Sequence, residues 1–139
     1  QPENKYEDLE EKEKADLVRQ LSVRDRLMRR LKVTKIPTVL RDDLGEFTIE
    51  SRLMTSAERE KAFNLNNMLI QSKKEPDKYG EALKGFKELA KEINVTKGLD
   101  ADFWDSGDVS DDVVIAFVLN ALIGTAKTVG DSVSSFRPK

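Results

Sequence analysis

Apolar and polar positions alternate with different periods along the chain, and the changes of period mark the predicted elements. Residues 1–14 are polar and acidic, with too few apolar side chains to offset the entropy of ordering, so we expect a flexible N-terminus. Residues 15–31 carry apolar side chains at helical spacing with charges between them. They predict one amphipathic helix, with an apolar face made of Leu17, Val18, Leu21, Leu27, Met28 and Leu31.

Residues 36–53 follow a period of two. Pro37 is incompatible with a helix interior, and Phe47, Ile49 and Ser51 alternate with polar residues after a turn-like Asp-Asp-Leu-Gly stretch. This pattern predicts a β-hairpin. Because an isolated two-stranded hairpin is only marginally stable in water, we expect its Phe47 and Ile49 face to lie on a helix or on another chain.

Two amphipathic helices are predicted to follow the hairpin. Thr55 and Glu58 fit a capping box, which starts a helix that should run to about residue 72. Pro76 favours the first turn of the next helix, which should end near Ile93. The apolar positions are Ala62, Phe63, Leu65, Leu69 and Ile70 in the first helix, and Tyr79, Ala82, Leu83, Phe86, Leu89, Ala90 and Ile93 in the second. A loop with several carboxylates should join the second helix to the last segment.

The last segment is the most apolar part of the chain. In residues 113–123 only Asn120 is polar, and Ser110 with the two acidic residues after it favours a helix start. The helical spacing of apolar residues continues to Phe136 despite Gly124. A helix that is apolar on all sides is normally the central helix of a bundle. The apolar run is too short for a membrane span, which needs about 20 residues, so we expect no membrane insertion.

These elements predict a mainly α-helical fold, a small helical bundle with one short β-hairpin near the N-terminal third. We expect one domain over residues 15–139. In an alternative interpretation, part of the last helix stays open in the monomer and docks on a second copy or on a partner helix; in both, Asn120 is expected to hydrogen-bond in the interior. The candidate docking residues are Ile115, Val118, Leu122, Ala126, Val129, Val133 and Phe136.

The composition excludes most of the side chains that enzymes commonly use as nucleophiles, bases or metal ligands. The 139 residues include no cysteine and no histidine, which excludes thiolate metal sites, cysteine nucleophiles and imidazole bases. No Gly-rich phosphate loop is present, so we expect no enzyme activity, no cofactor and no metal. The acidic loop over residues 100–112 lacks the ligand spacing of an EF-hand, and we interpret it as solvated acids and helix caps, with a cation site as the alternative. The absence of cysteine and of an apolar N-terminal run predicts a cytoplasmic protein without a signal peptide.

Charge is nearly balanced, with 24 basic and 26 acidic residues and a formal net charge of −2. The one basic concentration lies in the first predicted helix and contains Arg24, Arg26, Arg29 and Arg30. No aromatic residues are interleaved to stack on bases, so we interpret it as a solvated or acid-pairing face rather than a nucleic-acid site. The alternative is a helical interaction or regulatory module that contacts nucleic acid through this helix.

A hairpin that closes on a capped helix is the most distinctive order of elements in the chain. It is carried by Leu40, Gly45, Phe47, Thr48, Ile49, Leu53, Thr55 and Glu58, and the segment 104–110 then precedes a hydrophobic helix. This layout, over about residues 33–136, resembles the tail assembly chaperones of long-tailed phages and proviruses. The resemblance implies a non-enzymatic protein that binds the tape measure protein, recruits tail tube subunits, self-associates and leaves before the virion is finished.

Overall fold

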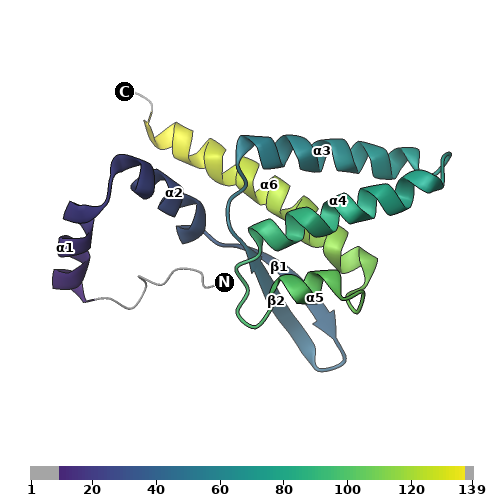
Figure 1. Cartoon of the computed structure of the whole chain (residues 1–139), viewed down its shortest axis with the longest axis horizontal. Helices are drawn as coiled ribbons and strands as arrows, with labels where there is room; N and C mark the ends of the chain where they lie inside the picture. The colour runs from purple at the N-terminus through teal and green to yellow at the C-terminus, as the bar shows by residue number, and fades with distance from the viewer. Residues whose placement is uncertain (1–9, 137–139) are drawn as a thin grey trace.

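The computed structural model describes residues 10–136. Its elements are α1 (Glu11–Gln20), α2 (Val23–Val33), β1 (Ile36–Asp42), β2 (Gly45–Ser51), α3 (Ser56–Gln71), α4 (Asp77–Ile93), α5 (Ala101–Asp105) and α6 (Asp111–Phe136). Helices α3, α4 and α6 pack together, and the strands form one antiparallel hairpin beside them (Figure 1). Over the described residues the predicted fold class, mainly helical with one hairpin, is confirmed. We call residues 36–136 the body and residues 11–33 the arm.

The core of the body lies where α4, α5 and the first half of α6 meet. Trp104 of α5 is fully buried and stacks on Phe117 of α6, with ring centroids 5.0 Å apart and an interplanar angle of 17°. Phe86 and Ile93 of α4 are fully buried as well. Helix α5 was missed by the sequence prediction, which placed a loop there, because five residues are too few for helical periodicity to be visible.

The root of the hairpin is fastened to α6. The side-chain amide of Asn120 donates hydrogen bonds to the Pro37 carbonyl at 2.7 Å and to the Thr38 hydroxyl at 3.0 Å. The predicted hydrogen bonding of Asn120 is confirmed, but its predicted place in the interior is wrong, because the residue is only half-buried and its bond to Pro37 is exposed. Gly124 lets the two elements approach, since a Cβ at this position would lie 2.6 Å from Cγ2 of Ile36. The hairpin is therefore held by both polar and steric contacts along one side of α6.

The two residues predicted to form the buried hairpin face behave differently. Ile49 is buried, but Phe47 is nearly half exposed. Phe47 pairs with Leu40 two positions nearer the turn, and this end of the hairpin extends away from the helices (Figure 1). The prediction is thus right for Ile49 and wrong for Phe47, because the helices cover only the root of the hairpin.

The predicted capping box at the start of α3 is confirmed. The Thr55 hydroxyl accepts from the Glu58 amide at 3.2 Å, and the Glu58 carboxylate accepts from the Thr55 amide at 3.0 Å. Arg52 donates two hydrogen bonds of 2.8 Å to the same carboxylate. Burial on its own would raise the pKa of Glu58, but the Arg52 and Thr55 hydrogen bonds outweigh it and lower the pKa below its ordinary value.

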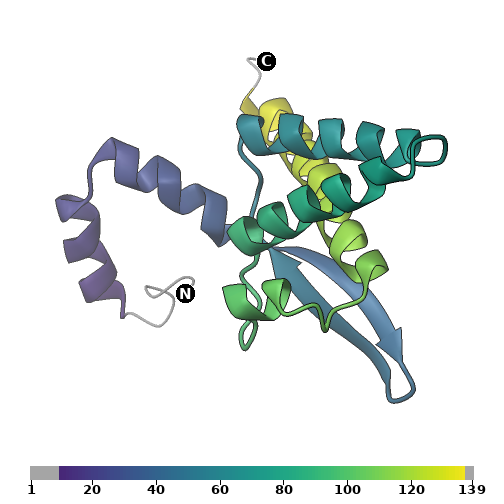
Figure 2. The same ribbon diagram turned by 45° about the vertical axis from the view of Figure 1, so that its right-hand side comes forward.

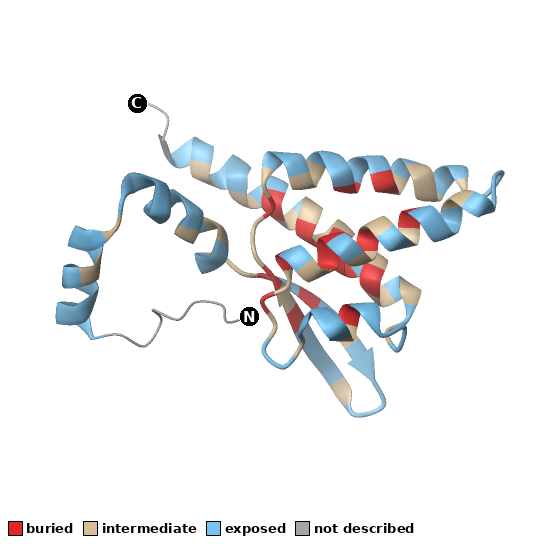
Figure 3. Ribbon diagram, viewed as in Figure 1, coloured by how far each residue is buried: buried red, intermediate tan, exposed pale blue. Residues whose placement is uncertain are grey.

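The single N-terminal helix predicted over residues 15–31 is wrong. The structure has two helices, because Ser22 caps α2 by accepting from the Asp25 amide at 3.1 Å, and the chain turns before it. Residues 11–14, which we placed in a flexible terminus, belong to α1, whereas residues 1–9 lie outside the described part. Neither helix of the arm contains a buried residue, and the arm stands apart from the core (Figure 3).

Candidate docking surface

Helix α6 divides into a covered half and an open half. In the first half Val114, Phe117, Val118 and Ala121 are fully buried. From Ile123 onward more of the helix is open: Ile123 is 67% exposed, and Val129 and Val133 are nearly half exposed, whereas Thr125 stays buried. An apolar helix that leaves the core in this way presents unpartnered apolar surface over several turns.

The predicted docking residues fall on both sides of this division. Ile115 and Leu122 are partly buried against the core, and Ala126, Val129 and Val133 are exposed on the same side of the helix. Val118 does not belong with them: it comes four residues after Val114, shares the buried face of α6 and is fully covered. The side chain of Phe136 lies outside the described part of the chain.

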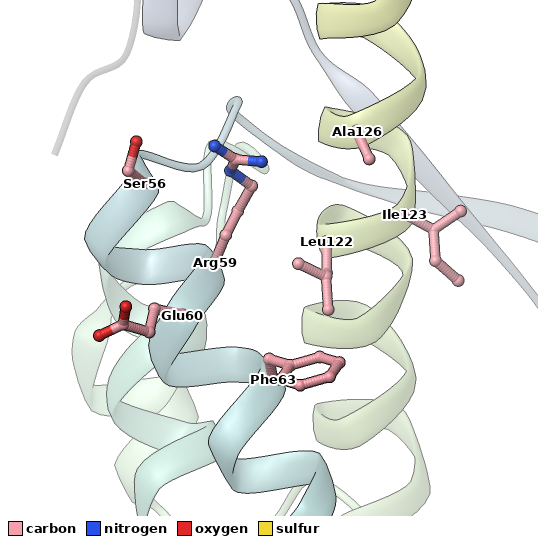
Figure 4. A pocket seen from close by; sticks show the side chains of 7 residues that line it. All are labelled: Ser56, Arg59, Glu60, Phe63, Leu122, Ile123 and Ala126. Carbon is pink, nitrogen blue, oxygen red and sulfur yellow. The ribbon is translucent and has the colours of Figure 1, made fainter.

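A shallow groove runs between α3 and α6. It has a volume of about 540 Å³ and is lined by Ser56, Arg59, Glu60, Phe63, Leu122, Ile123 and Ala126 (Figure 4). We call this surface, together with Val129 and Val133 beyond it, the α3/α6 groove. Its walls are mainly apolar, with the ring of Phe63 facing the side chains of α6 (Figure 4).

The contribution of α3 to this groove was not predicted. Phe63 and Ile70 were placed in the core with the other apolar residues of α3, but Phe63 is 60% exposed and Ile70 is similarly open. They lie seven residues apart on one side of the helix, whereas Ala62 and Leu65 lie on the buried side. This angular separation was the available signal that α3 has two apolar faces.

Arg59 places a positive charge on the wall of the groove. Its Nε atom is buried, and within residues 10–136 it has no hydrogen-bond or ion-pair partner. Arg52, by contrast, donates hydrogen bonds to the Glu58 carboxylate and to the Leu53 carbonyl. A guanidinium left without an acceptor beside an apolar groove favours a ligand that brings a carboxylate.

The basic patch predicted from the sequence lies on α2. Arg24, Arg26 and Arg30 are exposed and Arg29 is partly buried. Arg26, Arg29 and Arg30 are three and four residues apart and therefore share one side of the helix. They form a surface patch that is separate from the α3/α6 groove, which has no residue of the arm in its wall.

The acidic loop has structural roles for several of its carboxylates. Asp100 caps α5 by accepting from the Phe103 amide at 3.0 Å, and Asp105 pairs with Lys91 at 3.1 Å. Asp111 accepts a hydrogen bond from the Tyr79 hydroxyl, which raises the pKa of that tyrosine. Among the residues the structure describes, no group of three or more acidic side chains is placed to hold a metal ion.

By length and composition alone, α6 could cross a bilayer, and it is the one helix between residues 10 and 136 that could. The core helix of a soluble protein can meet the same criterion, and in α6 Phe117 and Val118 are fully buried in the body. The absence of a membrane span therefore stays a prediction.

Comparison of the chain with protein-family models, with curated proteins and with solved structures finds no match.

Proposed function

We propose that this protein is a non-enzymatic, tail assembly chaperone-like protein that holds an amphipathic helix of the tape measure protein in the α3/α6 groove and recruits tail tube subunits. The observation that supports this most directly is the open apolar half of α6 facing Phe63 of α3. In this proposal the protein works in the cytoplasm, without a cofactor, and leaves its client once assembly proceeds.

The spacing of the groove residues suits a helical client. Leu122, Ala126, Val129 and Val133 repeat at intervals of three and four along α6, so their side chains form one stripe. An amphipathic helix laid on such a stripe buries its own residues at matching intervals. A tape measure protein, being long and helical, would supply this pattern repeatedly along its length.

Arg59 adds a preference for a charged client residue to the apolar contact. Its guanidinium has no partner within the described residues, and Glu60 stands beside it on the groove wall. A client helix with a carboxylate next to its apolar stripe would satisfy Arg59, and a basic residue one turn away would meet Glu60. The preferred client segment is therefore apolar on one side with mixed charges along the edge.

Isothermal titration with a purified amphipathic-helix segment of a tape measure protein would test the proposal. We expect Ile123→Asp to weaken binding at least 10-fold, because it places a charge in the apolar wall, and Arg59→Gln to weaken binding about 10-fold. Leu44→Asp is the matched control, since Leu44 is 91% exposed at the hairpin turn, far from the groove. No binding by the unaltered protein, or equal loss in the control, would reject the proposal.

A second candidate function rests on the exposed arginines of α2. Arg24, Arg26 and Arg30 project from a helix without a buried residue, which is compatible with an interaction or regulatory module that contacts phosphates. This candidate needs the arm, whereas the chaperone-like function needs the groove. Variants of the two surfaces therefore separate the two functions.

A further inference from the structure

Several apolar side chains of the arm are exposed. Val23 is 77% exposed and Leu27 is 60% exposed, and Val18 and Met28 are about half exposed. Leu31, one further turn along, is partly covered, and its carbonyl accepts a hydrogen bond of 3.0 Å from the Leu53 amide of the body. The arm is thus a pair of consecutive helices, fixed to the body at the end of α2 and exposed along its apolar side.

The open side of the arm and the α3/α6 groove match in length. Helix α2 has 11 residues and is about 16 Å long, and the stretch of α6 from Leu122 to Val133 has nearly the same length at about 1.5 Å per residue. Val23, Leu27 and Leu31 recur every four residues, and the stripe on α6 recurs every three and four. Each surface therefore has the spacing that the other needs for a helix-in-groove contact.

We propose that, when no client is bound, the arm of one copy of this chain lies in the α3/α6 groove of a second copy, and that the exchange is reciprocal. The inference rests on the proposed function only in taking the groove as a helix-binding surface. It names the occupant of that surface before the client arrives. Client binding would then have to displace the partner's arm, which couples loading of the chaperone to dissociation of the pair.

The short linker between the arm and the body favours docking of the arm on a second copy over docking on its own chain. Two residues, Thr34 and Lys35, join α2 to β1, and they span at most about 7 Å. The Leu31 and Leu53 hydrogen bond fixes the last turn of α2 beside the body, and in Figure 2 the rest of the arm extends to the left of α3, α4 and α6. Folding back into the groove of the same chain would require this anchor to break.

The area is sufficient for a stable pair. At about 100 Å² for a fully exposed large apolar side chain, the open side chains of one arm supply about 300 Å² and those of one groove a similar amount. Two symmetric contacts would bury about 1,200 Å² of apolar surface, which reaches the range of specific interfaces. A twofold axis makes both contacts equivalent and leaves no groove or arm open, so the assembly closes at two copies.

Cysteine cross-linking would test the exchange, because the natural chain has no cysteine. A tagged full-length chain with Leu27→Cys is mixed with an untagged chain with Ile123→Cys and oxidised at low micromolar concentration. We expect a disulfide between tagged and untagged chains in most molecules. The control pairs the tagged Leu27→Cys chain with a Leu44→Cys chain, whose cysteine is exposed at the hairpin turn, and should cross-link at least 10-fold less. Circular dichroism of each variant checks that it is folded.

The outcomes separate this inference from the proposed function. Cross-linking no greater than in the Leu44→Cys control, or a monomer by light scattering at 50 to 100 micromolar protein, roughly the range in which weak pairs form, would overturn the exchange. If the cross-link forms and the tape measure segment does not lower its yield, the exchange stands and the proposed function fails. If the segment binds a protein that does not cross-link, the proposed function stands and the exchange fails.

Discussion

The two halves of α6 differ in apolar content and in surroundings. Residues 111–123 contain ten apolar side chains, and here Phe117 stacks on Trp104 and Val118 is fully buried, because α4, α5 and the hairpin root all pack on this part of the helix. Residues 124–136 contain four apolar side chains, and of these Val129 and Val133 are nearly half exposed. The elements packed around an apolar residue, and not its place in a helical pattern, therefore decide whether it supports the fold or stays exposed.

The difference shows what each half can contribute. A residue in the first half stabilises the fold through packing, so its loss should appear as a change in the free energy of unfolding. A residue in the second half is exposed in the isolated chain, so its loss should leave folding nearly unchanged and alter association. The contrast predicts opposite outcomes for the same chemical substitution at two positions of one helix.

The largest expected effect comes from placing a carboxylate in each half. Val118→Asp should unfold the protein, because an uncompensated buried charge costs several kcal/mol against a total stability of about 5 to 15 kcal/mol. Val129→Asp should leave the fold intact and weaken self-association or client binding. Circular dichroism melts and light scattering on the two variants measure both effects. If Val129→Asp unfolds as readily as Val118→Asp, α6 is core throughout and the contrast between its halves is lost.

The aromatic pair should account for much of the stability of the covered half. Trp104→Ala removes the fully buried indole that stacks on Phe117, and we expect a loss of about 3 to 5 kcal/mol in the free energy of unfolding. Phe47→Ala is the control, because it deletes an aromatic ring that is nearly half exposed and should cost about 1 kcal/mol. Urea unfolding curves would give both values. Similar losses at the two positions would mean that Trp104 is not part of a tightly packed core.

Helix α3 forms the other wall of the groove, and Glu58 stabilises its first turn. Glu58→Gln should cost about 2 kcal/mol near neutral pH, because it weakens charge-assisted hydrogen bonds from Arg52 and from the Thr55 amide. Since the folded-state pKa of Glu58 lies below its ordinary value of 4.5, its stabilisation is complete above that pH and is lost as pH falls through the lowered pKa.

Melting temperatures of the unaltered protein and the variant between pH 3 and 7 should therefore converge at the acidic end. Glu60→Gln makes the same chemical change on an exposed neighbour and should alter stability by less than about 0.5 kcal/mol. A constant difference between the unaltered protein and Glu58→Gln over the whole pH range would show that the Arg52 and Glu58 pair contributes no pH-dependent stability.

The smallest effect on stability is expected in the arm. Replacing Arg24, Arg26 and Arg30 together by Gln should change the free energy of unfolding by less than about 0.5 kcal/mol, since none of them is buried. We expect duplex DNA at physiological salt to bind weakly in fluorescence anisotropy, both before and after the change. Submicromolar binding that the triple variant loses would favour the nucleic-acid function over the groove-based one.

Several features of the molecule could be read directly from the sequence. The capping box of Thr55 and Glu58, the hairpin and the helical content depend on short-range patterns, because the residues involved lie within a few positions of each other. The hydrogen bonding of Asn120 was also predictable, since a lone polar group in an apolar helix needs a partner, but its half-buried position was not. A second capping signal, Ser22 with Asp25, was present but was overlooked, and the predicted single helix was wrong for that reason.

The tertiary structure alone decided which apolar faces are covered. Phe63 and Ile70 repeat at helical spacing as regularly as Ala62 and Leu65, yet the first pair is open and the second is buried. On α6, Val129 is exposed and Val118 is buried, although both lie at helical spacing. Leu27 of the arm also lies at helical spacing and is exposed. Periodicity determines that a helix has an apolar side, whereas burial depends on which distant segments pack against that side, and this is set by long-range contacts that local patterns do not encode.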